Sequence, residues 1–283
     1  MAIQETALPE VAGQALPPTK KRYRSPAGRP LTRSRFRLLA VCSFVAILAA
    51  WAIVTMGGMV KPIILPSPMA VLQSLGDQIQ NGELWADAKV STYRVMVGFL
   101  LSVVVAIPVG VLAGASSWVE ALVEPVVDFI RYLPIVAFVP LTIIWVGTND
   151  AQKFLIIWLG TVFQQILMIA ASTRTVPVDF VNLGATLGLG RVAILFKIVL
   201  PSVMPRIWDT LRITLGWAWT WLMIAELVAA TTGMGYRITQ AQRFLATDLI
   251  IGYVIVLGII GLVFDQIMRA VGHKLFAYER ISR

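Results

Sequence analysis

Long apolar runs dominate the pattern of hydrophobic and polar positions along the chain. A helix that crosses a membrane needs about 20 mostly apolar residues. Four runs approach or exceed this length without a charged residue, and two more contain a single carboxylate each, Glu226 and Asp265. The pattern predicts an all-α, polytopic membrane protein with six transmembrane helices, which cover residues 38–60, 95–119, 132–149, 154–173, 213–236 and 249–268.

The third of these spans is the least regular. Pro134 and Pro140 interrupt its helical pattern, and its apolar run has an alternative start near Pro125. Proline inside a membrane frees backbone carbonyls, which neighbouring groups or water must then satisfy. These prolines, together with Pro108 in the second span, therefore mark either hinges or simple kinks.

The composition agrees with a membrane protein and excludes a soluble globular enzyme. Of 283 residues, 58% are hydrophobic and only 14% are charged, whereas an average soluble domain carries about 25% charged residues. A single cysteine, Cys42, excludes an intramolecular disulfide. One cysteine and one histidine, His273, cannot assemble a metal site from soft ligands within one chain, so no metal is expected.

The distribution of charge predicts the orientation in the membrane. The net charge is +9, and eight cations precede the first apolar run. A basic tail on a soluble protein would suggest nucleic acid, but beside a membrane segment it agrees with the positive-inside rule, so no nucleic-acid partner is expected. Six spans place both termini on one side. Cytoplasmic termini put 18 Lys and Arg residues inside, Arg131 among them, and 6 outside.

The chain divides into three parts. Residues 1–36 are polar and proline-rich, which predicts a disordered, basic, cytoplasmic tail. Residues 37–275 hold the six spans, and residues 276–283 form a short cytoplasmic C-terminal tail. An outer connection, 61–94, is long enough to be structured, and Ser67-Pro68 is a good helix start. Its apolar residues recur at a helical spacing that predicts an amphipathic helix: Met69, Leu72, Leu75 and Ile79.

The cytoplasmic loop 174–212 contains the most informative motif of the chain. In this loop Gly188 is followed by nine residues, Ile198, one further residue and the pair Leu200-Pro201. Glycine at a turn and proline after a helical stretch are typical of a compact pair of helices. Such a loop is either a docking site for another protein or a simple connection that packs against the spans.

Two short helices are expected in this loop. The first covers 182–187, and Gly188 and Gly190 then allow a sharp turn. The second covers 193–199 and is ended by Pro201. One face of the second helix is apolar and suited to pack against the membrane bundle, through Ile194, Leu195 and Ile198.

The loop resembles the EAA signature of permease subunits of bacterial ATP-binding-cassette importers, whose pattern ends in G, nine residues and I-x-L-P. These landmarks stand here at Gly188, Ile198, Leu200 and Pro201, whereas the opening E-A-A is replaced by the residues Asn182, Leu183 and Gly184. Similarity to the nitrate, sulfonate, taurine and bicarbonate branch extends over about residues 38–275. Its other segments are Ile64-Leu65-Pro66-Ser67-Pro68, Gly82-Glu83-Leu84-Trp85, Ile107-Pro108-Val109-Gly110, Ala225-Glu226-Leu227-Val228-Ala229-Ala230 and Phe244-Leu245-Ala246-Thr247-Asp248.

The resemblance implies a type I importer permease fold in a bacterial inner (plasma) membrane. It implies a non-enzymatic subunit that pairs with a second permease copy, most simply as a homodimer, within membrane lipid. Two cytoplasmic ATPase subunits would hold ATP and Mg and dock on the loop, and an extracytoplasmic binding protein would deliver the solute. The chain has no G-x-x-x-x-G-K-[ST] sequence, so it is expected to bind no cofactor itself. The solute implied is a small anion such as nitrate, a sulfonate, taurine or bicarbonate, with an aromatic or heterocyclic compound as the alternative.

Polar residues inside the spans are the candidates for the translocation pathway, because such residues are costly in a membrane. Glu226 has three readings: it neutralises Arg94 or Arg212, caps a helix break near residues 233–235, or lines the pathway. Asp265 is spaced to pair with Arg269 on one helix face. The remaining candidates are two adjacent amides and a cluster in the fifth span, namely Gln164, Gln165, Trp217, Thr220 and Trp221, with packing between helices as the alternative.

Two other classes of membrane protein compete with an importer subunit. An intramembrane enzyme would need convergent nucleophile, base or metal-ligand pairs, and no catalytic residue is assigned here because Glu226 and Asp265 are isolated. A self-contained secondary transporter would be expected to carry inverted repeats or interrupted half-helices around a coupling-ion site. The sequence favours the importer subunit over both.

Overall fold

The computed structural model describes residues 32–277, and within this range every regular element is helical. The predicted tails at 1–36 and 276–283 therefore lie almost entirely outside the described residues. The elements in chain order are α1 (Arg33–Met56), α2 (Pro68–Gln80), α3 (Glu83–Ala115), α4 (Ser117–Ile130), the 3-10 helix η1 (Ile135–Phe138), α5 (Val139–Val146), α6 (Asp150–Arg174), α7 (Val178–Thr186), α8 (Arg191–Ile194), the π-helical η2 (Leu195–Val199), α9 (Leu200–Ala229), α10 (Met234–Arg243) and α11 (Thr247–Leu275).

The described residues contain enough long apolar helices to cross a membrane several times. Four helices qualify on their own: α1, α3, α6 and α11. Two further pairs qualify only together, because each is bent: α4 with η1–α5 by 84°, and α8–α9 with α10 by 49°. Counting each bent pair as one span gives up to six spans, in agreement with the number predicted from the sequence.

The predicted start of the second span is wrong by twelve residues. Helix α3 begins at Glu83 rather than at 95 and continues without a break through Pro108 to Ala115. This first part of α3 contains charged residues, a pattern that predicts a loop. Two of them, Asp87 and Arg94, are buried, because partners elsewhere in the chain hold them, as described below.

The third span also differs from the prediction. Its first half is α4, which begins at Ser117, and the chain turns sharply between Ile130 and Ile135 before η1 and α5. Pro134 lies at this break and has no N–H with which to continue the helix. The sequence pattern predicts a cytoplasmic position for Arg131, but this residue lies at the break inside the bent span.

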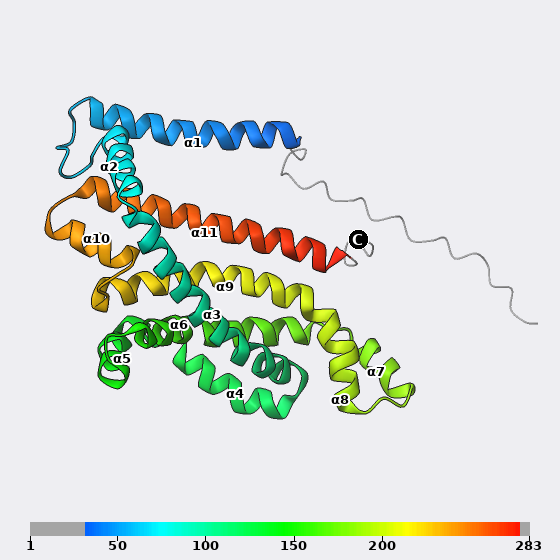
Figure 1. Ribbon diagram of the computed structural model, residues 1–283. Helices are drawn as coiled ribbons and strands as arrows, with labels where there is room; N and C mark the ends of the chain where they lie inside the picture. Colours follow the sequence, from blue (N-terminus) through cyan, green and yellow to red (C-terminus); the bar gives the residue numbers. More distant parts are fainter. Residues whose placement is uncertain (1–31, 278–283) are drawn as a thin grey trace, which may run out of the picture. The chain divides into compact units, whose positions relative to one another are not determined.

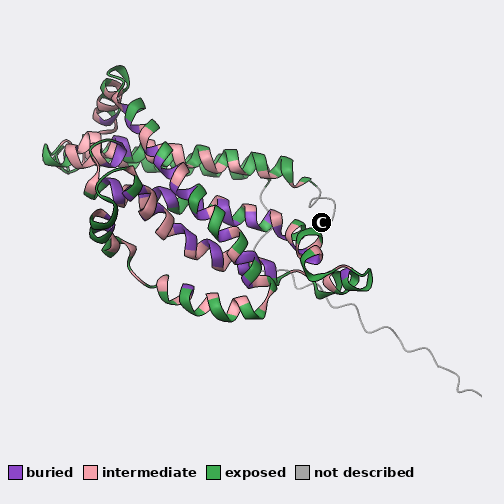
Figure 2. Ribbon diagram, turned by 60° about the horizontal axis from the view of Figure 1, so that its bottom comes forward, coloured by how far each residue is buried: buried purple, intermediate pink, exposed green. Residues whose placement is uncertain are grey.

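Helices α3, α6 and α9 pack side by side and form the core of the bundle (Figures 1 and 2). Glycines in α3 allow its backbone to approach α6. A Cβ atom on Gly110 would lie 2.8 Å from the Cβ of Ile169, and one on Gly114 would lie 2.5 Å from that of Thr173. Small residues at such contacts replace the hydrophobic driving force that is weak between helices in lipid.

Helix α2 begins as predicted. The Ser67 hydroxyl accepts a hydrogen bond from the Ala70 N–H at 3.2 Å, and Pro68 occupies the first turn. The predicted helix over these positions is present, with Val71 as its buried residue and Leu75 packed beneath Gly252 of α11. Three other residues of the predicted face are exposed in the single chain, namely Met69, Leu72 and Ile79.

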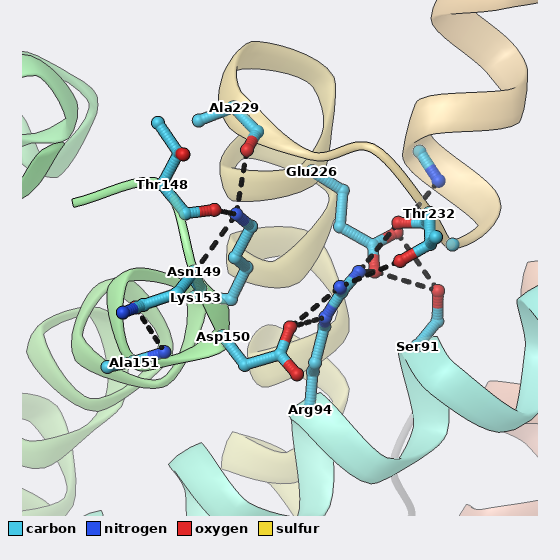
Figure 3. A network of polar contacts seen from close by, with 12 residues as sticks. Ser91, Arg94, Thr148, Asn149, Asp150, Ala151, Lys153, Glu226, Ala229 and Thr232 are labelled. Carbon is cyan, nitrogen blue, oxygen red and sulfur yellow. Dashed lines mark hydrogen bonds and ion pairs between the residues drawn. The ribbon is translucent and has the colours of Figure 1, made fainter.

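A buried ion pair joins α3 to α9 at the α5–α10 end of the bundle (Figure 3). The Arg94 guanidinium lies 2.7 Å from the Glu226 carboxylate, and both side chains are almost completely buried. The same guanidinium lies 2.7 Å from Asp150 at the start of α6. Of the two partners expected for Glu226, the structure selects Arg94. The other, Arg212, pairs with Asp265 at 3.2 Å, which also pairs with Arg269 as predicted.

Glu226 also caps the break between α9 and α10, which is the second of its predicted roles. Its carboxylate accepts a hydrogen bond from the Gly235 N–H at 2.8 Å and one from the Ser91 hydroxyl at 2.9 Å. The chain reaches this position through Gly233, which has φ +105°. A Cβ there would collide with Glu226 and lie 2.8 Å from the Arg94 guanidinium, so only glycine fits.

Further polar contacts extend the cluster at this end. The Asp87 carboxylate accepts hydrogen bonds from the Arg237 guanidinium at 2.9 Å and from the Tyr253 hydroxyl at 3.0 Å, which ties α3 to α10 and α11. Lys153 is buried, and its ammonium donates to the Ala229 carbonyl at 2.7 Å. This contact satisfies a carbonyl at the C-terminus of α9, where a cation is favoured.

Replacing Arg94 tests how strongly the fold depends on this cluster. Arg94→Gln leaves the Glu226 carboxylate buried without a cation, which costs about 3–5 kcal/mol. Glu226→Gln is expected to be milder, because Arg94 keeps Asp150 as a counterion. The measurement is the thermal unfolding midpoint of each purified variant in detergent, with the double variant completing the cycle.

The exposed Arg243 supplies the matched control, and Arg243→Gln is expected to leave the midpoint unchanged. The double variant is expected to lose less than the two single losses combined, since it removes both charges together. Additive losses, or equal effects of Arg94→Gln and Arg243→Gln, would contradict the assigned role of the pair.

Candidate functional site

A cavity of about 320 Å³ lies between α6, α9 and the break in the third span. It is lined by Arg131, Ile135, Leu159, Gly160, Phe163, Gln164, Trp217, Thr220 and Trp221. Gln164 is 14 residues after the start of α6 at Asp150 and 10 before its end at Arg174. With a rise of about 1.5 Å per residue, the cavity lies roughly 21 Å and 15 Å from the two ends of that helix. It is therefore at mid-depth of the bundle.

Two tryptophans of α9 form one wall of the cavity. Trp217 and Trp221 are four residues apart and share a helix face. Gly160 of α6 makes room for the second ring, because a Cβ on Gly160 would overlap the Trp221 indole. Trp219 points away, is buried, and packs against Phe264 of α11 with ring centroids 5.9 Å apart. The fifth span thus separates its tryptophans into a cavity pair and a packing residue.

The two adjacent glutamines have different environments. Gln164 lines the cavity, whereas Gln165 is fully buried and its amide donates a hydrogen bond to the Thr214 hydroxyl at 3.1 Å. Of the six residues predicted for the pathway, the structure brings four together here: Gln164, Trp217, Thr220 and Trp221. The other two, Gln165 and Glu226, lie in the helix packing and in the polar cluster instead.

Arg131 is the cavity residue that sequence reasoning missed. The uncharged run begins only at residue 132, which predicts a cytoplasmic position for Arg131. The signal that locates it is the alternative start of that span near Pro125 together with Pro134, which places a break rather than a loop between them. The guanidinium lies 3.1 Å from the Asp128 carboxylate and also donates to the Tyr132 hydroxyl at 3.1 Å.

The predicted loop motif forms a compact helical hairpin at the end of the bundle opposite α5 and α10 (Figure 1). Helix α7 covers Val178–Thr186, which is longer than the predicted 182–187, and the chain then turns at Gly188 with φ +77°. Gly190 has φ −69° and opens α8. Of the two glycines expected at the turn, Gly188 is therefore the one that adopts the left-handed conformation.

The two helices of the hairpin pack on each other at Gly184. This residue is buried, and a Cβ there would lie 2.5 Å from Cδ1 of Ile198 and 3.2 Å from Cγ1 of Ile194. The prediction that Ile194, Leu195 and Ile198 pack on the membrane bundle thus holds for one of them: Leu195 contacts the main core. The other two close the hairpin.

The prediction that Pro201 ends the second helix is wrong. Arg191 through Ala229 form one continuous helical rod in which Leu200 and Pro201 open α9. Proline inside a helix clashes with the carbonyl four residues earlier. The five residues before Leu200 form a π-helical turn, and this wider turn accommodates the proline without a break.

The surface of the hairpin is apolar. Asn182 is exposed, and the same hairpin exposes six large apolar side chains: Val178, Phe180, Leu183, Leu187, Val192 and Phe196. Contiguous exposed apolar groups at the end of a molecule are typical of a contact with another protein. Among the described residues no group of three or more His, Cys, Asp or Glu side chains is arranged to hold a metal ion.

Comparison with known proteins identifies the family of the chain. Residues 106–276, more than half of the chain, match the family model for binding-protein-dependent transport system inner membrane components. The chain is 32% identical to the taurine transport system permease protein TauC of Escherichia coli, over 90% of this chain and 92% of that protein. It is 27% identical to the bicarbonate transport system permease protein CmpB of Synechococcus elongatus, over 88% of this chain and 93% of that protein.

A solved structure shares the fold. The inward-facing methionine ABC transporter MetNI matches with a TM-score of 0.53 and 21% identity, over 64% of this chain and 92% of the matched chain. The helical architecture, the membrane spans and the family match agree with one another. The chain therefore belongs to the family of binding-protein-dependent transport system inner membrane components, the multi-pass permease subunits of ABC importers.

Proposed function

We propose that this protein is the permease of an ATP-driven importer for a small solute with an anionic head group, of the taurine or sulfonate class. Two copies would form the translocation pathway, an extracytoplasmic binding protein would deliver the solute, and cytoplasmic ATPase subunits would supply the energy. The relatives named for taurine and bicarbonate transport support a solute with an anionic, oxygen-bearing head group. The strongest support for the mechanism is the apolar hairpin of α7 and α8, which continues without interruption into the helix that lines the cavity.

The hairpin is proposed as the docking site of the ATPase. Its exposed side chains include Leu183 and Leu187 on α7, and burying such groups against a partner is favourable by about 25 cal/mol per Å² of apolar area. This end of the molecule would face the cytoplasm, together with both termini, as the distribution of Lys and Arg predicts. The polar cluster around Arg94 would then lie at the extracytoplasmic end.

The cavity is proposed as part of the solute pathway. It lies at mid-depth and combines a guanidinium, an amide and a hydroxyl with aromatic walls. Ligand sites in proteins are mostly apolar with a few placed polar groups, and their volumes begin near 300 Å³. A movement of the hairpin would reach Trp217 and Trp221 through the continuous rod Arg191–Ala229.

Reconstitution tests the proposed function directly. The permease, its ATPase subunits and the solute-binding protein are placed in proteoliposomes, and accumulation of radiolabelled taurine is measured. Uptake is expected to require both ATP and the binding protein. Uptake that persists without the ATPase would indicate a secondary transporter, and uptake of an uncharged heterocyclic compound in preference to any anion would overturn the solute class.

Two glycines of the hairpin turn form a matched pair for testing the docking role. Gly188→Ala places a Cβ at φ +77°, a conformation that costs an L-residue about 1–2 kcal/mol. Gly190→Ala adds the same atom at φ −69° with nothing within 4 Å. The first change is expected to weaken binding of the ATPase roughly 5- to 30-fold, and the second is expected to leave it unchanged.

The measurement is the affinity of purified ATPase subunit for the permease in detergent, with solute-stimulated ATP hydrolysis as a second readout. The thermal unfolding midpoint of the permease is followed in parallel, because a change confined to the hairpin spares the bundle. If both alanine variants bind ATPase as the unmodified protein does, the hairpin is not the docking site.

A further inference from the structure

Arg131 is the one charged residue among the described residues that line the cavity. The cavity lies roughly 15–21 Å from the ends of α6, so its cation is far from either end of the bundle. A charged side chain at such a depth is costly and is by default a sign of function. Arg94, Lys153 and Arg237 lie in the polar cluster at the α5–α10 end and have their own partners there.

The contacts of Arg131 leave donors available for a ligand. Its Nε–H faces the Asp128 carboxylate at 3.1 Å, and one terminal nitrogen donates to the Tyr132 hydroxyl at 3.1 Å. A guanidinium has five N–H donors in a planar fork, which suits two oxygens of one anion. Asp128 is on the preceding turn of α4 and is not among the residues that line the cavity, whereas Arg131 is.

The rest of the lining suits the hydrocarbon part of an organic anion. Five of the lining side chains are apolar or aromatic, namely Ile135, Leu159, Phe163, Trp217 and Trp221. The neutral polar groups are the Gln164 amide and the Thr220 hydroxyl, both able to donate hydrogen bonds to oxygen. A bare inorganic oxyanion would leave the aromatic walls without a partner, whereas an organic sulfonate would use both parts of the cavity.

We infer that the cavity is a mid-membrane binding site for organic sulfonates, with Arg131 as the residue that binds the anionic head. Gln164 and Thr220 donate to the remaining sulfonate oxygens, and Trp217 and Trp221 cover the carbon chain. Asp128 is an internal counterion that competes with the solute for the guanidinium. This inference rests on the proposed function and adds to it the roles of Arg131, Gln164 and Thr220 and a competing charge, Asp128.

Substitutions of Asp128 and Arg131 test the inference. If Arg131 binds the solute, the two substitutions change the affinity in opposite directions, whereas a purely structural ion pair predicts a loss from both. Binding of 1-butanesulfonate to the purified permease–ATPase complex is measured by calorimetry, without binding protein or ATP. Arg131→Gln is expected to weaken binding on the order of tenfold or more, since a charge-assisted bidentate contact is lost. Asp128→Asn is expected to strengthen it about two- to fivefold, since the competing carboxylate is removed.

Three comparisons make the result specific. Arg131→Lys keeps the charge but not the planar fork, so intermediate affinity is expected. Arg243→Gln changes an exposed cation of α10 that is remote from the cavity lining, and is expected to leave binding unchanged. With the unmodified complex, sodium nitrate and butylammonium are both expected to bind more weakly than 1-butanesulfonate, because the first lacks a carbon chain and the second carries the wrong charge.

Equal losses from Arg131→Gln and Asp128→Asn would show a structural ion pair and overturn the inference, as would unchanged binding in Arg131→Gln. Nitrate binding as strong as that of butanesulfonate would overturn the ligand class. If Arg131→Gln fails to assemble, Gln164→Leu takes its place. Gln164→Leu is then expected to weaken binding of 1-butanesulfonate and Asp128→Asn to strengthen it. Failure of ATP-driven taurine uptake by the unmodified complex would instead count against the proposed function, since the binding assay needs neither ATP nor transport.

Discussion

The ion pair between Arg94 and Glu226 is the contact on which one end of the molecule depends. Two charges that are almost completely buried lie 2.7 Å apart, on residues that are 132 positions apart in the sequence. Each would be costly to bury alone. Because Glu226 also accepts the Gly235 N–H and Arg94 also contacts Asp150, the pair fixes α3, α6, α9 and the start of α10 together.

The two breaks in the bent spans are where polar groups gather. At the first, between α4 and η1, the chain presents Arg131 to the cavity. At the second, between α9 and α10, the freed N–H groups of Gly233, Met234 and Gly235 donate to Asp87, Ser91 and Glu226. Unpaired backbone is tolerated at membrane depth only where protein or water satisfies it. The second break is therefore closed by a structural polar cluster, whereas the first places one cation in the lining of a largely apolar cavity.

Sequence reasoning predicted the features that depend on local pattern. Apolar run length identified the spans, Ser67-Pro68 located the start of α2, and glycine spacing located the turn at Gly188. It failed where partners distant in sequence decide the outcome. Asp87 and Arg94 extend α3 because residues of α9, α10 and α11 neutralise or cap them. Pro201 does not end its helix, because a preceding π-helical turn absorbs the strain.

That π-helical turn also sets the angle about the helix axis between the hairpin and the face of α9 that lines the cavity. It lies between the hairpin of α7 and α8 and the cavity-lining face of α9, within one continuous rod. A π turn holds about one residue more than an α turn, and each residue rotates an α-helix by about 100°. The extra residue at Leu195–Val199 therefore determines which side of the hairpin faces outward when Trp217 and Trp221 face the cavity. The turn therefore sets the angle about the helix axis at which a rotation of the hairpin would be passed on to the cavity-lining face of α9.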